Sequence, residues 1–371
     1  MTRQRILITG GAGFIGSHLA DELLTAGHSV RALDVLAPQV HGSGIPEYLD
    51  PDVELIEGDV RDPVAVRHAL EGIDAVYHFA AAVGVGQSMY EIERYTEINT
   101  AGTAVLLDAL VERPVQRLVV ASSMSIYGEG LYRAADGTER PVGERSLEQL
   151  KQSQWEFLDD TGVPLQPIPT PEHKIPALSS IYALTKYSQE RMCLMIGRAY
   201  NIPTVALRFF NVYGPRQALS NPYTGVLAIF AARYLNDNPP LVFEDGRQQR
   251  DFVSVHDLVR ACRLCLSAPL ATGQAINIGS GHAYTIAALA ARMARALNKE
   301  SIGATITGMY RMGDIRHCFA DISLARTLIG YEPEVELEDG MVELAEWLSG
   351  QAADDRVETA RVELTSRGLT L

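Results

Sequence analysis

Short apolar runs alternate with helically spaced apolar positions along the first half of the chain. The runs Ile6–Ile8, Ser29–Leu33, Val53–Ile56, Ala75–Phe79 and Arg117–Ala121 predict buried parallel strands. After the first run, apolar residues recur with helical spacing at Phe14, Ile15, Leu19, Leu23 and Leu24. Strands that alternate with helices in this way are typical of an α/β fold with a doubly wound parallel sheet.

The second half departs from this alternation. Residues 128–178 are rich in glycine and proline, and we expect an inserted surface excursion near the active site, with at most a short helix within Glu144–Phe157. A long helix is expected from about Ser180 to Tyr200, and a sixth strand over Thr204–Asn211. We expect a first domain over 1–210, a smaller mixed α/β domain interleaved with it over 211–350, and a polar tail over 351–371.

The first strand runs into the glycine-rich stretch Thr9–Gly16, which opens a helix. Gly10 allows a tight turn, Gly13 lets a pyrophosphate approach the backbone, and Gly16 lets the helix pack close to the sheet. The N–H groups at the helix start, around Phe14 and Ile15, face the phosphates. The stretch predicts a dinucleotide site, although a glycine turn in another kind of α/β protein gives the same pattern.

Residues at the following strand ends complete the predicted dinucleotide site. Asp34 is placed to accept hydrogen bonds from the ribose hydroxyls and to repel a 2′-phosphate, which favours NAD over NADP. Asp59 is placed for the adenine amino group and Val60 for a backbone contact; Asp59 is alternatively a helix N-cap, although Asp62 is the better candidate for that. The small residues Ala80 and Ala81 let the backbone lie under the cofactor, and Asn99 on the next helix is also assigned to this site.

Composition excludes several classes of partner. The chain has 371 residues, of which 47% are hydrophobic, and no apolar run reaches the roughly 18 residues that span a bilayer. The first strand begins too early to leave room for a signal peptide, and four cysteines without a pairing pattern fit a reducing compartment. We therefore expect a cytoplasmic protein without a membrane partner. A net charge of −14 argues against nucleic acid.

The candidate chemistry combines Ser123, at the end of a strand, with Tyr182 and Lys186 on the long helix. Tyrosine and lysine at i and i+4 lie on one helix face. A phenol with a reference pKa of ~10 is a poor base at neutral pH, but a nearby ammonium and a positive nicotinamide ring favour the phenolate. Beside NAD, the pair takes a proton from a carbinol while hydride leaves. A tyrosine and lysine at this spacing are also common by chance, as an exposed pair without a role.

Together these motifs resemble the extended short-chain dehydrogenase/reductases, in particular nucleotide-sugar epimerases and dehydratases, over roughly residues 4 to 348. The matching stretches are Thr9–Gly16, Gly58–Val60, His78–Ala81, Ser122–Gly128, Tyr182–Lys186, Arg208–Pro215, Arg250–Phe252 and Arg311–Asp314. The resemblance implies a Rossmann-type domain with bound NAD and a smaller C-terminal substrate domain. It also implies a homodimer formed through the helices near 91–111 and 180–200.

The resemblance also implies a set of substrate residues. Asn211 would donate to the diphosphate of a sugar nucleotide, and Arg250 and Arg311 would clamp its two phosphates. Ser123, Ser125 and Asp314 complete the expected substrate site. The alternative for the two arginines is a structural salt bridge with Asp251 or Asp314.

The reaction that the resemblance implies is a C4 epimerisation. Relatives that dehydrate carry an Asp-Glu pair where this chain has Met124 and Ser125, so oxidation at C4 and return of the hydride to the other face is expected. The stretches Arg145–Leu150, Pro167–Thr170, Ser220–Gly225 and Gly313–His317 resemble epimerases acting on dTDP-L-rhamnose, which is converted to dTDP-6-deoxy-L-talose, more than the UDP-galactose type. The alternatives are a UDP-hexose 4-epimerase, a 4-ketoreductase for nucleotide-linked 4-keto-6-deoxysugars, and an NAD-binding scaffold or sensor.

No metal site is expected. Relatives with a similar insert often hold cysteine pairs there, but this insert contains no cysteine. Cys262 and Cys265 have no second pair nearby and are interpreted as small buried apolar residues on a helix. His317 is either a sugar contact or a structural imidazole.

Overall fold

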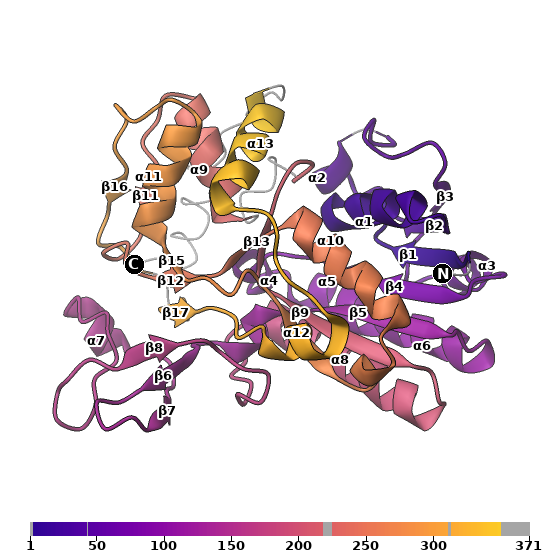
Figure 1. Cartoon of the computed structure of the whole chain (residues 1–371), viewed down its shortest axis with the longest axis horizontal. Coiled ribbons are helices and arrows are strands. Elements are labelled where there is room, and N and C mark those ends of the chain that lie inside the picture. The colour runs from indigo at the N-terminus through magenta and orange to yellow at the C-terminus, as the bar shows by residue number, and fades with distance from the viewer. Residues whose placement is uncertain (1–2, 43, 218–224, 311–312, 350–371) are drawn as a thin grey trace.

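A seven-stranded parallel sheet forms the centre of the molecule (Figure 1). The computed structural model describes residues 3–42, 44–217, 225–310 and 313–349. The strands of the sheet are β1 (Arg5–Thr9), β2 (Ser29–Asp34), β3 (Glu54–Glu57), β4 (Ala75–His78), β5 (Arg117–Ser123), β9 (Thr204–Phe209) and β14 (Ala275–Ile278). Their order is β14-β9-β5-β4-β1-β2-β3, so strand order reverses beside β1, as in a Rossmann-type sheet. The expected fold class is confirmed.

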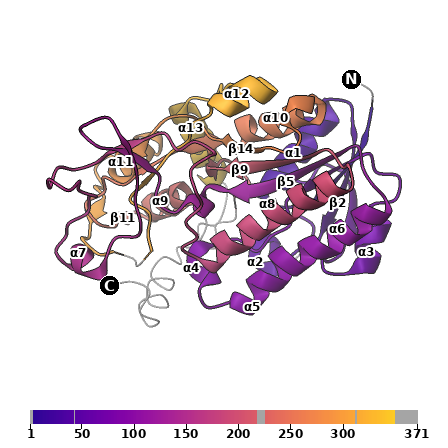
Figure 2. The same ribbon diagram turned by 90° about the horizontal axis from the view of Figure 1, so that it is seen from below.

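Helices cover both faces of this sheet (Figure 2). One face carries α1 (Phe14–Thr25), α10 (Val255–Leu264) and α12 (Ser323–Ile329), and the other carries α3 (Pro63–Ala69), α6 (Gly102–Glu112) and α8 (Ile181–Ala199). Alternate residues of β1 divide between the two sides: Ile6 and Ile8 pack in the cluster that contains Leu19, while Leu7 packs in the cluster that contains Leu106. This two-sided burial explains why the strands read as continuous apolar runs.

The chain after residue 210 contributes to both lobes of the molecule. Strand β14 pairs in parallel with β9, with Ala275 opposite Ala206, and helix α10 packs against α1. The other lobe packs α9 (Val226–Leu235), α11 (Ile286–Ala296) and α13 (Leu337–Ser349) around a separate apolar cluster. Short strand pairs border this lobe: β10 (Asn211–Tyr213) with β13 (Phe252–Ser254), β11 (Leu241–Val242) with β16 (Thr305–Ile306), and β12 (Gln249–Arg250) with β15 (Tyr284–Thr285) and β17 (His317–Cys318).

The insert corrects one expectation, because it has regular structure. Strands β6 (Leu131–Arg133), β7 (Glu139–Pro141) and β8 (Gln166–Ile168) form an antiparallel sheet, and the helix expected within Glu144–Phe157 is limited to α7 (Leu147–Lys151). Tyr132, Ala134 and Leu165 form a small buried apolar cluster within the insert. Strands of three residues are too short to show alternation, and each outer strand contains a proline, which is typical of edge strands.

The helix expected near residues 91–111 contains a rare irregularity. It begins as α5 (Ile92–Tyr95), continues as a π-helical segment η1 (Thr96–Ala101) and ends as α6. Single π-turns inside α-helices occur frequently at functional sites. The remaining short helices are α2 (Pro38–His41), α4 (Val85–Ser88), η2 (Met124–Tyr127), η3 (Cys265–Ser267) and η4 (Pro269–Ala271).

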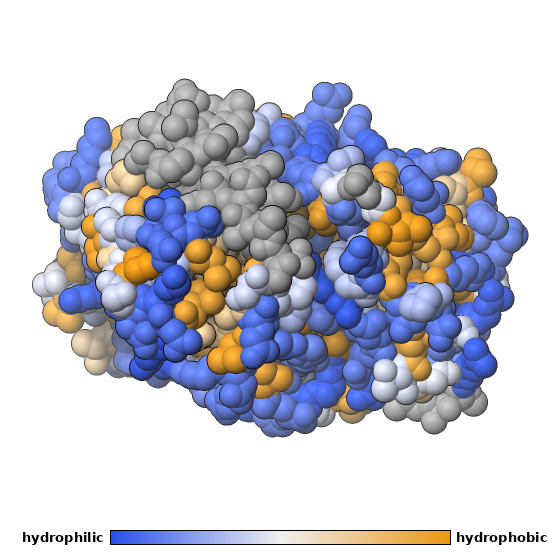
Figure 3. Space-filling model, turned by 90° about the horizontal axis from the view of Figure 1, so that it is seen from above, coloured by the Kyte–Doolittle hydropathy of each residue, from blue (hydrophilic) through white to orange (hydrophobic). Residues whose placement is uncertain are grey.

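One face of the molecule is mostly polar. Figure 3 shows hydrophilic residues over most of one face, with hydrophobic residues in separate groups. Along the described residues, no helix combines the length and the apolar character that crossing a bilayer requires. Cys262 and Cys265 are fully buried, as expected of apolar packing residues, and both are free thiols.

Candidate functional site

The glycine-rich turn after β1 is shaped by contacts that leave no room for side chains. Gly10 has φ +74°, and a Cβ on it would lie 2.9 Å from the backbone nitrogen of Ala80. A Cβ on Gly16 would collide with the carbonyl oxygen of Gly10. Gly13 precedes the first residue of α1, and no side chain caps that helix start. The turn is therefore a bare cradle of backbone N–H groups at a helix N-terminus, which fits a pyrophosphate.

Asp34 lies at the end of β2 and accepts a hydrogen bond from the backbone of the glycine-rich turn. Its Oδ2 accepts a hydrogen bond from the N–H of Ala12 at 3.0 Å, and its Oδ1 accepts one from the N–H of Leu36 at 2.9 Å. Two residues that the sequence interpretation missed lie beside it: His41, whose Nε2 is 3.6 Å from Oδ1, and Tyr48, which donates to the carbonyl oxygen of Ala12. Both lie in the polar stretch between β2 and β3, which has no periodicity, so no local pattern marked them.

Asp59 follows β3 as expected, and its carboxylate already has a partner. Arg61 approaches it at 2.7 Å, and the hydrogen bonds from Arg61 lower the pKa of Asp59. The alternative of an N-cap does not apply to Asp59, because Asp62 caps α3 by accepting from the N–H of Val64 at 2.8 Å. Val60 is buried beside this turn. Contact of Asp59 and Val60 with adenine stays a prediction.

Asn99 lies in the π-helical segment and is fully buried. Its Oδ1 accepts from the N–H of Ala82 at 2.7 Å, and its Nδ2 donates to the carbonyl of Ala82 and to Oγ1 of Thr185, both at 3.0 Å. The side chain thus fixes the loop after β4, which includes Ala80 and Ala81, against α8. The geometry gives Asn99 a positioning role next to the predicted cofactor site.

Ser123 and Tyr182 lie next to each other where β5 ends and α8 begins. Ser180 caps α8 by accepting from the N–H of Ala183 at 3.1 Å, which places Tyr182 in the first turn. Burial raises the pKa of the Tyr182 phenol, and a hydrogen bond with Ser123 opposes this rise. The hydroxyl of Ser125 donates to Oγ of Ser123 at 2.9 Å. The predicted catalytic serine and tyrosine are therefore brought together.

Lys186 follows one turn after Tyr182 and is buried. Its ammonium donates to Oε1 of Gln189 at 2.7 Å. Burial lowers the pKa of Lys186 to about 8, and Cys193 and Glu190 oppose this shift. Gln189 is a partner that the sequence interpretation missed.

Behind Lys186, a chain of buried polar groups crosses from the sheet to the helices. His78 contacts Oγ1 of Thr9 through Nδ1 and Oγ1 of Thr103 through Nε2, each at 2.8 Å. Gln189 donates to the same Thr103 oxygen at 2.9 Å. Burial, and to a smaller extent Lys186, lowers the pKa of His78 to about 3. His78 therefore stays neutral while the protein is folded.

This depressed pKa predicts sensitivity to acid. The unfolded chain binds a proton at His78 near pH 6.5, whereas the folded chain binds it only near pH 3. The free energy of unfolding therefore falls as the pH drops from 6.5 towards 3. Between pH 6.5 and pH 4, His78 should contribute a loss of about 3 kcal/mol. Urea unfolding at the two pH values should show a smaller pH-dependent loss for His78→Asn than for the wild type. An identical loss in both proteins would contradict the prediction.

Of the expected substrate residues, Asn211, Arg250 and Asp314 lie in the part of the chain that follows β9. The side chain of Asn211 donates to the carbonyl of Asp251 at 2.8 Å. Arg250 donates to carbonyl oxygens of the segment 315–316, and its Nη2 is 3.6 Å from Oδ1 of Asp314. The structural ion pair weighed as an alternative is thus present for Arg250 and Asp314. Contact of these residues with a diphosphate stays a prediction.

The other expected site residues are either outside the described residues or held by structural contacts. Arg311 and residues 220–224 of the stretch Ser220–Gly225 lie outside the described residues, as does the tail over 351–371. His317 is buried, accepts the N–H of Gln249 at Nδ1, and pairs through Nε2 with Glu156 at 3.0 Å, which makes it a structural imidazole. No metal-binding group of three or more His, Cys, Asp or Glu side chains occurs in the described ranges.

The chain is similar to known proteins over most of its length. The model of the NAD dependent epimerase/dehydratase family matches residues 6–151 and 159–279. The chain is 34% identical to a dTDP-L-rhamnose 4-epimerase of Burkholderia thailandensis, over 93% of this chain and 95% of the relative. It is 30% identical to a putative UDP-glucose 4-epimerase of Methanocaldococcus jannaschii, over 92% of this chain and 98% of the relative.

Solved structures agree with these matches. A UDP-glucose 4-epimerase of Thermotoga maritima with UDP-glucose superimposes with a TM-score of 0.76 at 30% identity, covering 93% of this chain and 98% of the other. A UDP-glucose 4-epimerase of Thermus thermophilus in complex with NAD has a TM-score of 0.71 at 29% identity, covering 94% and 100%.

Proposed function

This chain belongs to the NAD-dependent epimerase/dehydratase family, and from that premise we propose that it interconverts dTDP-L-rhamnose and dTDP-6-deoxy-L-talose. It is an NAD-dependent enzyme of the nucleotide-sugar epimerase type. The observation that carries the proposed chemistry is the pairing of Ser123 with Tyr182 near the carboxyl ends of the parallel strands, where the glycine cradle also lies.

The proposed reaction uses these side chains to move one proton. NAD supplies, when bound, an acceptor and later a donor of hydride. Tyr182, hydrogen-bonded to Ser123, takes the proton of the C4 hydroxyl as the carbinol becomes a ketone, and returns it when the other face of the ketone is reduced. We expect Lys186, whose ammonium donates to Gln189 in this structure, to favour the phenolate when NAD is bound.

The side chains that follow Ser123 favour epimerisation over dehydration. Met124 and Ser125 offer no carboxylate, and the thioether of Met124 lies 3.7 Å from Nδ2 of Asn211. Elimination of water needs a base at the adjacent carbon and an acid at the leaving hydroxyl. With Tyr182 as the single acid–base group of the proposed mechanism, a C4 proton and hydride cycle is the chemistry that balances.

The nucleotide and sugar are supported by resemblance. The relative named for dTDP-L-rhamnose is 34% identical, and the relative named for UDP-glucose is 30% identical. We therefore propose dTDP-L-rhamnose as the substrate and keep the UDP-hexoses as the comparison. A UDP-hexose 4-epimerase would use the same residues for the same steps.

One experiment tests the proposal. Purified protein is denatured and its released nucleotide is identified, while a second sample is incubated with dTDP-L-rhamnose, or with UDP-glucose, in D2O. We expect released NAD, a new dTDP-sugar and no deuterium at carbon, because the hydride returns directly. Conversion of UDP-glucose alone would replace the substrate, and deuterium at C3 or C5 would overturn the mechanism. Net consumption of reduced cofactor with a 4-keto sugar would indicate a ketoreductase.

We also propose a homodimer formed through α8 and the helix that ends as α6. These helices lie side by side on one face of the sheet (Figure 2). Apolar side chains that remain exposed on or beside them include Ile92, Leu184 and Met195, each about half exposed. Burial of these side chains would favour association. We expect light scattering at micromolar concentration to give twice the chain mass; the mass of one chain would contradict this.

A further inference from the structure

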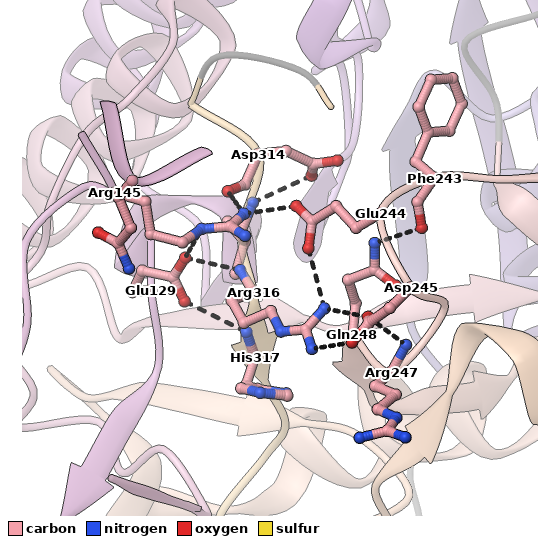
Figure 4. A network of polar contacts seen from close by, with 12 residues as sticks. Glu129, Arg145, Phe243, Glu244, Asp245, Arg247, Gln248, Asp314, Arg316 and His317 are labelled. Carbon is pink, nitrogen blue, oxygen red and sulfur yellow. Dashed lines mark hydrogen bonds and ion pairs between the residues drawn. The ribbon is translucent and has the colours of Figure 1, made fainter. Parts of the chain in front are cut away.

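The insert holds the backbone of a short segment of the other lobe, residues 314–317. Glu129, at the start of the insert, accepts hydrogen bonds from the backbone N–H groups of Arg316 and His317 at 2.6 and 3.2 Å. Arg145, also from the insert, donates Nη2 to the carbonyl of the segment's first residue at 2.9 Å. Both insert side chains are more than nine-tenths buried. Figure 4 shows the two side chains converging on this segment.

The side chains of the segment close the same network from the other direction. Arg316 is fully buried and pairs with Glu156 of the insert at 2.5 Å, with Asp245 at 2.7 Å and with Glu244 at 2.9 Å. Glu244 also pairs with Arg145 at 2.7 Å. Two arginines, one from the insert and one from the segment, thus share the buried carboxylate of Glu244 (Figure 4). Loss of Glu244 would remove the buried carboxylate that pairs with both arginines, so this position is strongly specified.

The segment in turn holds Arg250. Its Nη1 donates to the carbonyl of Arg316 at 3.0 Å, and its Nη2 donates to the carbonyl of Ile315. The carboxylate of Asp314 lies 3.6 Å from the same Nη2. The direction in which this guanidinium points is therefore fixed by the backbone that the insert anchors.

We propose that Glu129, Arg145 and Glu156 of the insert are positioning residues for recognition of the substrate's diphosphate. The proposal rests on the role of Arg250 given under the proposed function. An arginine fork binds phosphate oxygens through directed hydrogen bonds, so a small displacement of its anchoring carbonyls weakens binding. The glycine cradle, built on β1 and α1, shares no residue with this network. The insert therefore acts on the sugar nucleotide and leaves NAD binding unaffected.

Arg145→Lys in the full-length protein with its NAD tests this inference. Lysine keeps the charge but loses the planar guanidinium whose Nη2 contacts both Glu244 and the carbonyl of Asp314. We expect calorimetry to show about tenfold weaker binding of dTDP, within the range for one charge-assisted hydrogen bond, and a much smaller change for dTMP. With a substrate that is turned over, KM should rise while kcat and the NAD content stay unchanged.

The insert supplies a matched control. Arg140, on β7, is also an arginine of the insert. It is half exposed, and its nearest carboxylate, Asp136, is as far as 4.0 Å away. Arg140→Lys should leave dTDP binding, KM and NAD content unchanged. If Arg145→Lys does not fold, Glu156→Gln carries the test, because that side chain is one-third exposed and its loss of charge removes one of the three carboxylates that hold Arg316.

Variants at Arg250 separate the inference from the proposed function. If Arg250→Lys weakens dTDP binding and Arg145→Lys adds nothing in that background, the two residues act through one another and the inference is supported. If Arg250→Lys weakens binding but Arg145→Lys and Glu156→Gln do not, or if their effects add independently, the inference is overturned and the role of Arg250 stands. If Arg250→Lys changes nothing, the assigned role of Arg250 fails first.

Discussion

Replacing Tyr182 by phenylalanine is expected to lower kcat by about 100- to 10,000-fold, the range for loss of a positioned acid–base group. The change removes the oxygen that is hydrogen-bonded to Ser123 and preserves the ring that packs edge-on against Tyr95 at 6.5 Å. Stability should therefore change little. Turnover of the nucleotide sugar, measured together with NAD content and the urea midpoint, checks this expectation.

Tyr200 provides the control for this substitution. It directly follows α8, and its side chain is about half exposed. Tyr200→Phe should leave kcat within about twofold of the wild type, because the side chain is exposed and has no part in the proposed reaction. If Tyr182→Phe retained full activity with NAD bound, the tyrosine would have no part in proton transfer, and the scaffold interpretation would return.

The second large effect is expected on stability, from Glu190→Gln. Glu190 and Arg208 form a buried two-point ion pair between α8 and β9, with oxygen–nitrogen distances of 2.7 and 2.9 Å. Ser122 donates to the same carboxylate at 2.7 Å. Loss of the negative charge leaves the Arg208 guanidinium buried without compensation, which costs about 3–5 kcal/mol. The free energy of unfolding in urea measures this loss.

A surface pair calibrates that result. Glu112 pairs with Arg67 at 3.1 Å, and both side chains are at least half exposed. Glu112→Gln should leave the urea midpoint almost unchanged, because solvent screens exposed pairs. Equal effects of the two substitutions would show that Glu190 contributes no more than a surface charge. Since Glu190 also follows Lys186 by one turn, loss of NAD from the variant would locate the disturbance at the site.

Local patterns were sufficient to predict the central sheet and the glycine turn. Continuous apolar runs identify strands buried on both faces, and the spacing of Gly10, Gly13 and Gly16 reflects steric limits that act within a few residues. The meeting of Ser123 and Tyr182 was predictable for a related reason, because both lie at the carboxyl edge of the sheet that the alternation of elements implies.

Features built from distant residues gave no such signal. The partners of Glu129 and Arg145 lie in a lobe that the chain reaches only after the long helix, so no window of sequence contains both halves of the network. The strands of the insert are three residues long, below the length at which alternation can be recognised. Asn99 was assigned to the correct region, but its hydrogen bonds to Ala82 depend on a π-turn that spacing alone does not predict.

The placement of β14 has a consequence for synthesis of the chain. Because β14 pairs with β9, the nascent protein exposes one edge of the parallel sheet until residues 275–278 leave the ribosome. That open edge, with unpaired backbone groups beside the apolar residues of β9, is a template for pairing with another chain. A fragment that stops near residue 210 would retain the edge permanently, and we expect it to aggregate. The seventh strand thus protects the first lobe from misassembly as well as completing its core.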